Sequence, residues 1–246
     1  MINTLSKLSS VASKAENSSL NLRFNSSLPI TITVLESMTL DRYKLLLGNR
    51  EFTTKSQKKL EKGVKYWGNF GENKDGIITI SGLVKKPSFF QDSSLFLDFE
   101  LNTILQEIKS LDYPSRFYKN WILENLATKG IDKNTFRALT QMLMALNEQI
   151  FHLPMKSGEK PLLMQFSSVI NERVDFYMAY ENLGPLRGYV LNGTTNKTVS
   201  MDVLYEKSFY FLKKEFEKLD IISHMNIDKN IKPLYDTDKL MLDIKG

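Results

Sequence analysis

The chain of 246 residues suits one large domain or two small ones, and its hydrophobic content of 42% supplies ample material for a core. It contains no cysteine, which excludes disulfides, thiolate catalysis and cysteine-ligated metals. The net charge of +5 is uneven, because residues 1–90 hold 14 Lys and Arg against 7 Asp and Glu. This basic half favours an anionic partner, either nucleic acid, an anionic lipid surface or an acidic protein, and a lysine-rich solubilising surface is the simpler alternative.

Residues 1–27 are rich in Ser, Asn and Leu, a composition that does not favour a packed helix. We therefore predict a mobile tail over this range. The chain has no apolar run of the roughly 18–20 residues that a membrane-spanning helix needs, and its N-terminus lacks the apolar core of a secretory signal. We expect no membrane insertion.

Residues 28–90 predict a small β-barrel. Apolar and polar residues alternate in short runs that are separated by polar turns, which is typical of half-buried strands. The expected strands cover residues 30–34, 43–47, 51–56, 64–70 and 77–83. Five short strands favour a barrel of the oligonucleotide/oligosaccharide-binding kind.

Residues 95–150 predict a helical segment, because apolar residues recur there at helical spacing. The first helix carries the stripe Leu101, Ile104, Leu105, Ile108 and Leu111, and Pro114 stops it. A second helix begins near Ser115 and ends at Gly130, and Asp132 caps a third.

Residues 151–246 predict a C-terminal ββαβ unit, so the fold class is α+β. The first strand presents Val174, Phe176, Met178 and Tyr180 on one face and continues beyond a kink at residues 182–185. The second strand presents Val199, Met201, Val203 and Tyr205. A helix follows with Phe209, Leu212, Phe216 and Leu219, and residues 224–232 form the last strand.

This C-terminal pattern resembles the C-terminal domain of flagellar hook-length control proteins. The resemblance covers roughly the last 90 residues and rests on Leu183-Gly184, the strands at 186–191 and 199–203, and the Leu212/Phe216/Leu219 helix. It implies a non-enzymatic protein without a cofactor that docks on the flagellar export-gate switch protein or on another export or motor component. The expected location is cytoplasmic, with association with the flagellum or export without a cleaved signal as further expectations.

The resemblance also implies a set of partner-binding residues. Gly184 would allow close approach of a partner, and Arg187 would pair with an acidic partner surface. The full set carried over is Leu183, Gly184, Pro185, Leu186 and Arg187. Hook-length control proteins carry a long N-terminal region that resembles a measuring tape. A short tail precedes the barrel here, so we expect a role other than length measurement.

Signals for an enzyme are weak. His152 and His224 stand at no metal-ligand spacing, and no nucleotide-binding or nucleophile motif occurs, so we expect neither a catalytic site nor a bound metal. The alternative function is single-stranded nucleic-acid binding by the basic barrel, because lysines can contact phosphates and aromatic side chains can stack on bases. The residues predicted for this role are Lys58, Lys59, Lys65 and Trp67.

Overall fold

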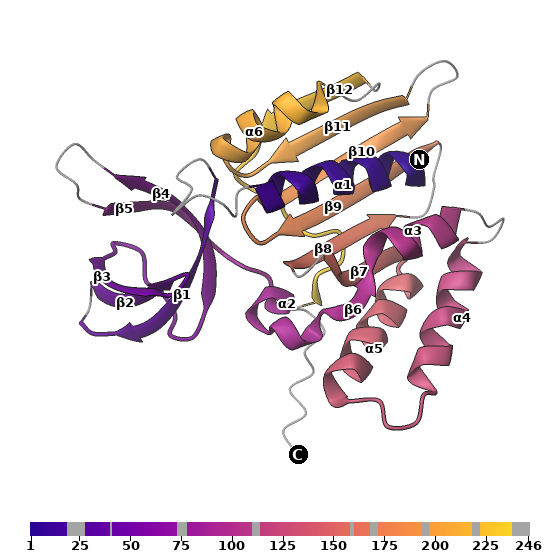
Figure 1. Cartoon of the computed structure of the whole chain (residues 1–246), viewed down its shortest axis with the longest axis horizontal. Coiled ribbons are helices and arrows are strands. Elements are labelled where there is room, and N and C mark those ends of the chain that lie inside the picture. Colours follow the sequence, from indigo (N-terminus) through magenta and orange to yellow (C-terminus); the bar gives the residue numbers. More distant parts are fainter. Residues whose placement is uncertain are drawn as a thin grey trace.

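The structure, a computed structural model, describes residues 1–18, 28–39, 41–72, 78–109, 114–157, 160–167, 172–192, 197–217 and 222–237. These residues form an α+β fold with two β-sheets (Figure 1). A five-stranded sheet has the order β3-β2-β1-β4-β5, and a seven-stranded sheet has the order β12-β11-β10-β9-β8-β7-β6. The predicted fold class is therefore confirmed.

The five-stranded sheet confirms the predicted N-terminal strands but corrects the predicted barrel. Its strands are β1 (Ile30–Ser37), β2 (Arg42–Leu47), β3 (Arg50–Lys55), β4 (Lys65–Glu72) and β5 (Ile78–Lys85). All pairs are antiparallel, and β3 and β5 are the two edges, which are not hydrogen-bonded to each other within the described residues. The sheet therefore stays open. Its small core contains Ile32, Val34, Tyr43, Leu45, Leu47, Leu60 and Tyr66.

The seven-stranded sheet is an antiparallel meander with a parallel strand at each edge. The meander consists of β7 (Ile150–Ser157), β8 (Lys160–Ser167), β9 (Arg173–Tyr180), β10 (Gly184–Asn192) and β11 (Lys197–Val203). The edge strands are β6 (Leu97–Glu100), parallel to β7, and β12 (Ile222–Ile227), parallel to β11. Parallel neighbours need crossover connections, and helices supply both of them.

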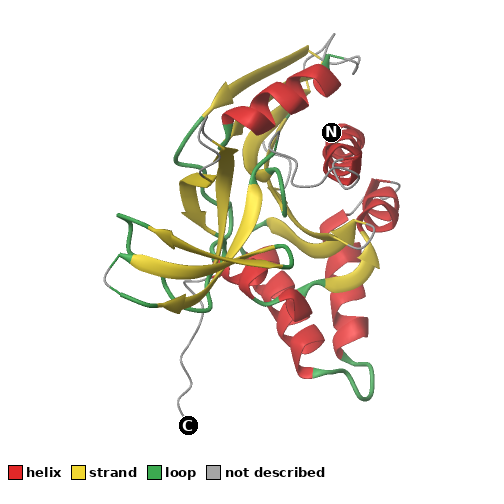
Figure 2. Ribbon diagram, turned by 60° about the vertical axis from the view of Figure 1, so that its left-hand side comes forward, coloured by secondary structure: helices red, strands yellow, loops and turns green. Residues whose placement is uncertain are grey.

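Helices cover one face of this larger sheet (Figure 2). They are α1 (Ile2–Ser18), α3 (Leu101–Lys109), α4 (Pro114–Leu126), α5 (Lys133–Asn147) and α6 (Glu206–Phe216). The Asp132 side chain caps α5 by accepting hydrogen bonds from the backbone N–H groups of Asn134 and Thr135, as predicted. One apolar core runs from Leu5 to Phe216 and joins these helices to the C-terminal strands.

Helix α1 corrects the predicted mobile tail. Leu5, Leu8 and Ala12 lie on one side of the helix and are at most 1% exposed, within the main core. The small polar residues Thr4 and Ser9 are buried with them. Serine therefore serves here as a small packing residue, a role that composition does not predict. Residues 19–27, the rest of the predicted tail, lie outside the described residues.

The predicted kinked strand at residues 173–191 is two strands. β9 and β10 pair antiparallel, with Gly184 opposite Tyr180 and Leu186 opposite Met178, so residues 181–183 form a tight hairpin turn. Gly184 has a φ of 77°, which only glycine adopts without strain. The Gly and Pro at this point therefore reverse the chain. The predicted inward faces are confirmed for β9 and β11, because Phe176, Met178 and Met201 lie in the main core. Tyr205, predicted for the same face, follows β11 and packs in a separate cluster with Trp67.

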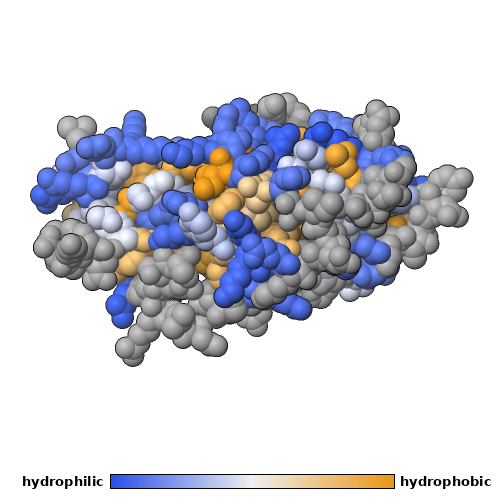
Figure 3. All heavy atoms as spheres, turned by 90° about the horizontal axis from the view of Figure 1, so that it is seen from above, coloured by the Kyte–Doolittle hydropathy of each residue, from blue (hydrophilic) through white to orange (hydrophobic). Residues whose placement is uncertain are grey.

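The upper part of the molecule in Figure 1 is formed by α6 and β12. Seen from above, its margins are hydrophilic and apolar side chains show between them (Figure 3). Exposed apolar residues of the two elements include Tyr210, which is 64% exposed, and Ile227. Among the helices of the described residues, none has the length and apolarity needed to span a bilayer.

The second face of the large sheet is covered by a different set of residues. Beside the aromatic residues of α2 (Ser88–Gln91), the chain beyond β12 crosses this face as a strap, which we define as residues 228–237. Gln165 on β8 is fully buried beneath it. Its Oε1 accepts hydrogen bonds from the backbone N–H groups of Leu234 and Tyr235, and its Nε2 donates to the Tyr235 carbonyl at 2.9 Å.

His152 on β7 completes this buried layer. Its Nδ1 lies 2.9 Å from Gln165 Nε2, which is a donor, so Nδ1 accepts and the neutral ring carries its proton on Nε2. The ring packs edge-on against Phe89 at 4.9 Å. Burial lowers the pKa of His152 to about 3, so the ring stays neutral in the folded protein.

We expect His152 to make stability depend on pH. The unfolded state binds a proton near pH 6.5 and the folded state does not, so stability is lost as pH falls from about 6.5 towards 3. Between about pH 7.5 and about pH 5 the free energy of unfolding should fall by about 2 kcal/mol from this group. Urea titrations of the wild type and of His152→Leu would measure it. The wild type should lose about 2 kcal/mol more than the variant between these two pH values, and a constant offset would contradict the prediction.

Candidate functional site: the junction and the open groove

The residues predicted to bind a partner lie mostly inside the fold. Leu183, Gly184, Pro185 and Leu186 are buried, so their side chains do not form an exposed surface. The carbonyl of Leu183 accepts a hydrogen bond from Ser208 Oγ of α6 at 2.7 Å. Within this set, Arg187 is the exposed residue, and its Nη1 donates to the Lys232 carbonyl of the strap at 3.1 Å. The segment therefore joins the sheet, α6 and the strap.

Gly184 is needed for a contact between the two sheets. A Cβ atom at this position would lie 2.9 Å from the ring of Tyr205, which packs against the hairpin. The Tyr205 hydroxyl donates to the Gly82 carbonyl of β5 at 3.0 Å. Burial raises the pKa of Tyr205, so the hydroxyl stays protonated and remains a donor.

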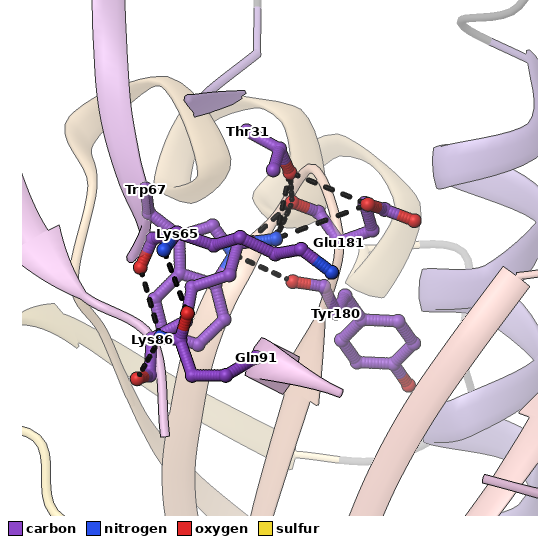
Figure 4. Close-up of polar contacts among 7 residues, drawn as sticks. All are labelled: Thr31, Lys65, Trp67, Lys86, Gln91, Tyr180 and Glu181. Atoms are coloured by element: carbon purple, nitrogen blue, oxygen red, sulfur yellow. Dashed lines mark hydrogen bonds and ion pairs between the residues drawn. The ribbon is translucent and has the colours of Figure 1, made fainter. Parts of the chain in front are cut away.

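Trp67 on β4 is the centre of the junction between the two sheets (Figure 4). It is 1% exposed, and its Nε1 donates to the carbonyls of Tyr180 at 2.9 Å and Glu181 at 3.0 Å. Its ring packs against Phe90 of α2. Trp67 is thus not accessible for stacking on a base.

Lys86 lies beside Trp67 with a side chain that is only 1% exposed. Its Nζ donates to Thr31 Oγ1 at 2.6 Å and to the Glu181 carbonyl at 3.4 Å, and lies 4.0 Å from Glu181 Oε1. The ammonium also lies 5.1 Å from the centre of the Trp67 ring, at cation–π distance. A buried charge needs such partners, and their placement ties the two sheets together.

Lys65 also belongs to the junction. Its backbone N–H donates to Gln91 Oε1 at 2.6 Å, and its carbonyl accepts from Gln91 Nε2 at 3.1 Å (Figure 4). Neither Lys65 nor Trp67 lines the pockets described below, whereas Lys58 and Lys59 do. Of the four residues predicted to hold an anionic ligand, Lys65 and Trp67 therefore belong to the junction, whereas Lys58 and Lys59 line the pockets.

A groove opens between the two edge strands of the small sheet. It is a cavity of about 690 Å³, bounded on one side by the end of β3 and on the other by β5. Leu45, Leu60, Ile80 and Leu83 supply its apolar surface. The polar lining is formed by Asp41, Thr54, Lys55, Ser56, Gln57, Lys58, Thr79 and Ser81. No local sequence pattern indicates the β5 part of this lining, because β5 lies across from β3 only in the folded sheet.

A second cavity of about 590 Å³ continues the groove along the loop that follows β3. The two cavities share Ser56, Gln57 and Leu60, and the second adds Lys59 and Lys62. Lys58 spans the opening, because its Nζ donates to the Leu83 carbonyl of β5 at 2.9 Å. Lys55 Nζ lies 4.0 Å from Asp41. The rim of the groove is consequently rich in lysine.

Within the described residues, no group of three His, Cys, Asp or Glu side chains is placed to hold a metal ion. Comparison with protein-family models, with curated proteins and with solved structures finds no match to this chain. The fold and the groove define an α+β protein in which a small open sheet with a lysine-lined groove is fixed to a larger helix-covered sheet.

Proposed function

We propose that this protein is a non-enzymatic protein-interaction component of the flagellar or type III export apparatus. Its partner would be the export-gate switch protein or another export or motor component, as the resemblance to hook-length control proteins implies. The observation that supports the proposal is the arrangement of the four elements that carry the resemblance. β10, β11, α6 and β12 follow one another in the chain, and the three strands are adjacent in one sheet.

The contact surface is the outer face of β10, β11 and β12, which points away from the main core. Side chains at alternate positions form rows across these strands, as the pairing of Arg187 with Asp202 and of Asp202 with Asn226 shows. We define the outer face as Arg187, Tyr189, Leu191, Ser200, Asp202, His224 and Asn226, which are exposed or half-buried. Its mixed polar and apolar character is that of an ordinary non-obligate protein interface.

Binding at such a face can change the state of the partner without making or breaking a covalent bond. A protein that binds one state of its partner more tightly than another shifts the partner towards that state. The buried segment at residues 183–186 would then position the outer face instead of forming it. This assigns Gly184 and its neighbours a structural part in the interaction.

The test uses the full chain and the purified cytoplasmic domain of the export-gate switch protein from the same organism. Isothermal titration calorimetry should detect binding by the wild type, and Leu191→Asp should weaken it at least about tenfold, as loss of a central interface contact does. Leu191 is 36% exposed, so the variant should fold. Deleting residues 171–246 would be a poorer test, because it removes strands that share the main core.

The matched control is Leu123→Asp on α4, which makes the same change at a residue that is 43% exposed on a different element. It should bind as tightly as the wild type. The proposal fails if the wild-type chain does not bind the switch protein, or if the variants at positions 191 and 123 weaken binding equally.

A further inference from the structure

We propose that the groove of the small sheet binds an extended acidic segment of a partner protein, which adds a strand between β3 and β5. This surface is separate from the outer face of the large sheet. The inference goes beyond the proposed function, and it holds whether or not the partner belongs to an export apparatus.

The edges of the small sheet provide the backbone contacts. β3 pairs with β2 and β5 pairs with β4, so each has one side without a neighbouring strand in the described residues. At the far end of β5 the carbonyls of Gly82 and Leu83 already accept hydrogen bonds from Tyr205 and Lys58. The segment Thr79–Ser81 faces the groove opposite Thr54 and Lys55. An extended peptide can pair with such an exposed edge through its main chain.

The shape and surface of the groove suit alternate side chains of an extended chain. Ile80 and Leu83 are half-buried and form the accessible apolar floor, and the buried Leu45 and Leu60 lie beneath them. A volume of about 690 Å³ lies within the range of about 300–1,000 Å³ for ligand-binding pockets. Because successive residues of a strand point to opposite sides, every second side chain would reach this floor.

The rim selects for negative charge. Lys55 and Lys58 border the first cavity together with Asp41, and Lys59 and Lys62 border its continuation together with Glu61, so four lysines face two carboxylates. Lys59 and Lys62 are exposed and form no ion pair with a described residue. Acidic side chains that point away from the floor would lie beside these four ammonium groups. Charge complementarity of this kind steers association and fixes the register of a partner.

The burial of the aromatic residues favours a peptide over a nucleic acid. Single-stranded nucleic acid is usually held by exposed aromatic rings on which its bases stack. In the small sheet Tyr43, Tyr66 and Trp67 are at most 3% exposed, and the half-buried Phe52 and Phe70 do not line the groove. The groove thus offers lysines, strand edges and a small apolar floor, which are the groups that an acidic peptide strand uses.

The test begins with a displayed library of random peptides of about ten residues, from which the peptides that bind the immobilised full-length protein are selected. The most enriched peptides are then synthesised with a fluorophore. We expect the enriched peptides to contain Asp or Glu in alternation with β-branched residues. In fluorescence anisotropy, Lys55→Glu and Lys58→Glu should each weaken binding at least about tenfold, as loss of a close charge pair does. Lys119→Glu, the same charge change at an exposed position of α4, should leave binding unchanged.

Hydrogen exchange identifies the binding mode, because strand addition slows the exchange of β3 and β5 amides and a purely electrostatic contact does not. Thermal unfolding of each variant verifies that it is folded. Three outcomes would overturn the inference: enrichment of peptides without acidic residues, binding that is indifferent to both groove substitutions, or tighter binding of a thymidylate oligonucleotide of about ten nucleotides that competes at the same lysines. Slowed exchange at both edges together with loss of affinity in Lys55→Glu would support it.

Discussion

Gly188→Ala is expected to lower the free energy of unfolding by about 3–5 kcal/mol, the largest effect of any single methyl group we predict. Gly188 lies in the middle of β10, between Phe176 of β9 and Met201 of β11. A Cβ atom there would overlap the backbone carbonyl oxygen of Ser200 and would lie 2.9 Å from the Cα of Met201. A flexible side chain could move aside, but the backbone of a central strand cannot move without breaking its ladder.

Urea denaturation followed by circular dichroism measures the change in stability. Gly130→Ala is the control for a methyl group added without a close neighbour: Gly130, unlike Gly188, has a positive φ of 78°, but no atom lies within 4 Å of its added Cβ. That variant should cost about 1 kcal/mol, the ordinary cost of a side chain at positive φ. Equal losses for the two variants would show that β10 and β11 do not approach each other as closely as the structure has them.

Gln165→Leu is expected to release the strap and to cost about 3 kcal/mol. Leucine fills a similar volume but neither accepts the N–H groups of Leu234 and Tyr235 nor donates to the Tyr235 carbonyl. Backbone groups that remain buried without partners carry their full desolvation penalty. The strap should therefore leave the sheet face, and its amides should exchange with solvent many times faster than in the wild type.

Hydrogen exchange with peptide-level resolution over residues 228–237 tests this prediction, with unfolding measured in parallel. Ser88→Ala removes a single contact with the strap, the 3.0 Å hydrogen bond between Ser88 Oγ and Thr237 Oγ1. It should cost at most about 1 kcal/mol and leave exchange at Leu234 and Tyr235 slow. If the amides of the strap exchange as slowly in Gln165→Leu as in Ser88→Ala, Gln165 does not anchor the strap.

The candidate groove was only partly predictable from the sequence. Lys58 and Lys59 stand in a run of lysines between two strands, and this local pattern marked them as residues that could meet an anion. Thr79 and Ser81 carry no such signal, because they reach the groove only when β5 lies across from β3. Lys65 and Trp67 follow this run in the sequence. In the structure, however, the Lys65 backbone and the Trp67 side chain form hydrogen bonds in the junction between the two sheets.

The alternation of apolar and polar residues by itself determined the α+β class, the five N-terminal strands, the helices at residues 101–147 and the inward faces of β9 and β11, because strand and helix periods are local properties of the chain. Tertiary structure decided that the small sheet stays open, that serine-rich α1 is buried, and that Leu183 and Gly184 lie inside a hairpin. These outcomes depend on contacts between residues far apart in the chain: Trp67 with Tyr180, Tyr205 with Gly82, and Gln165 with Tyr235. No local pattern encodes which distant backbone group a buried side chain will meet.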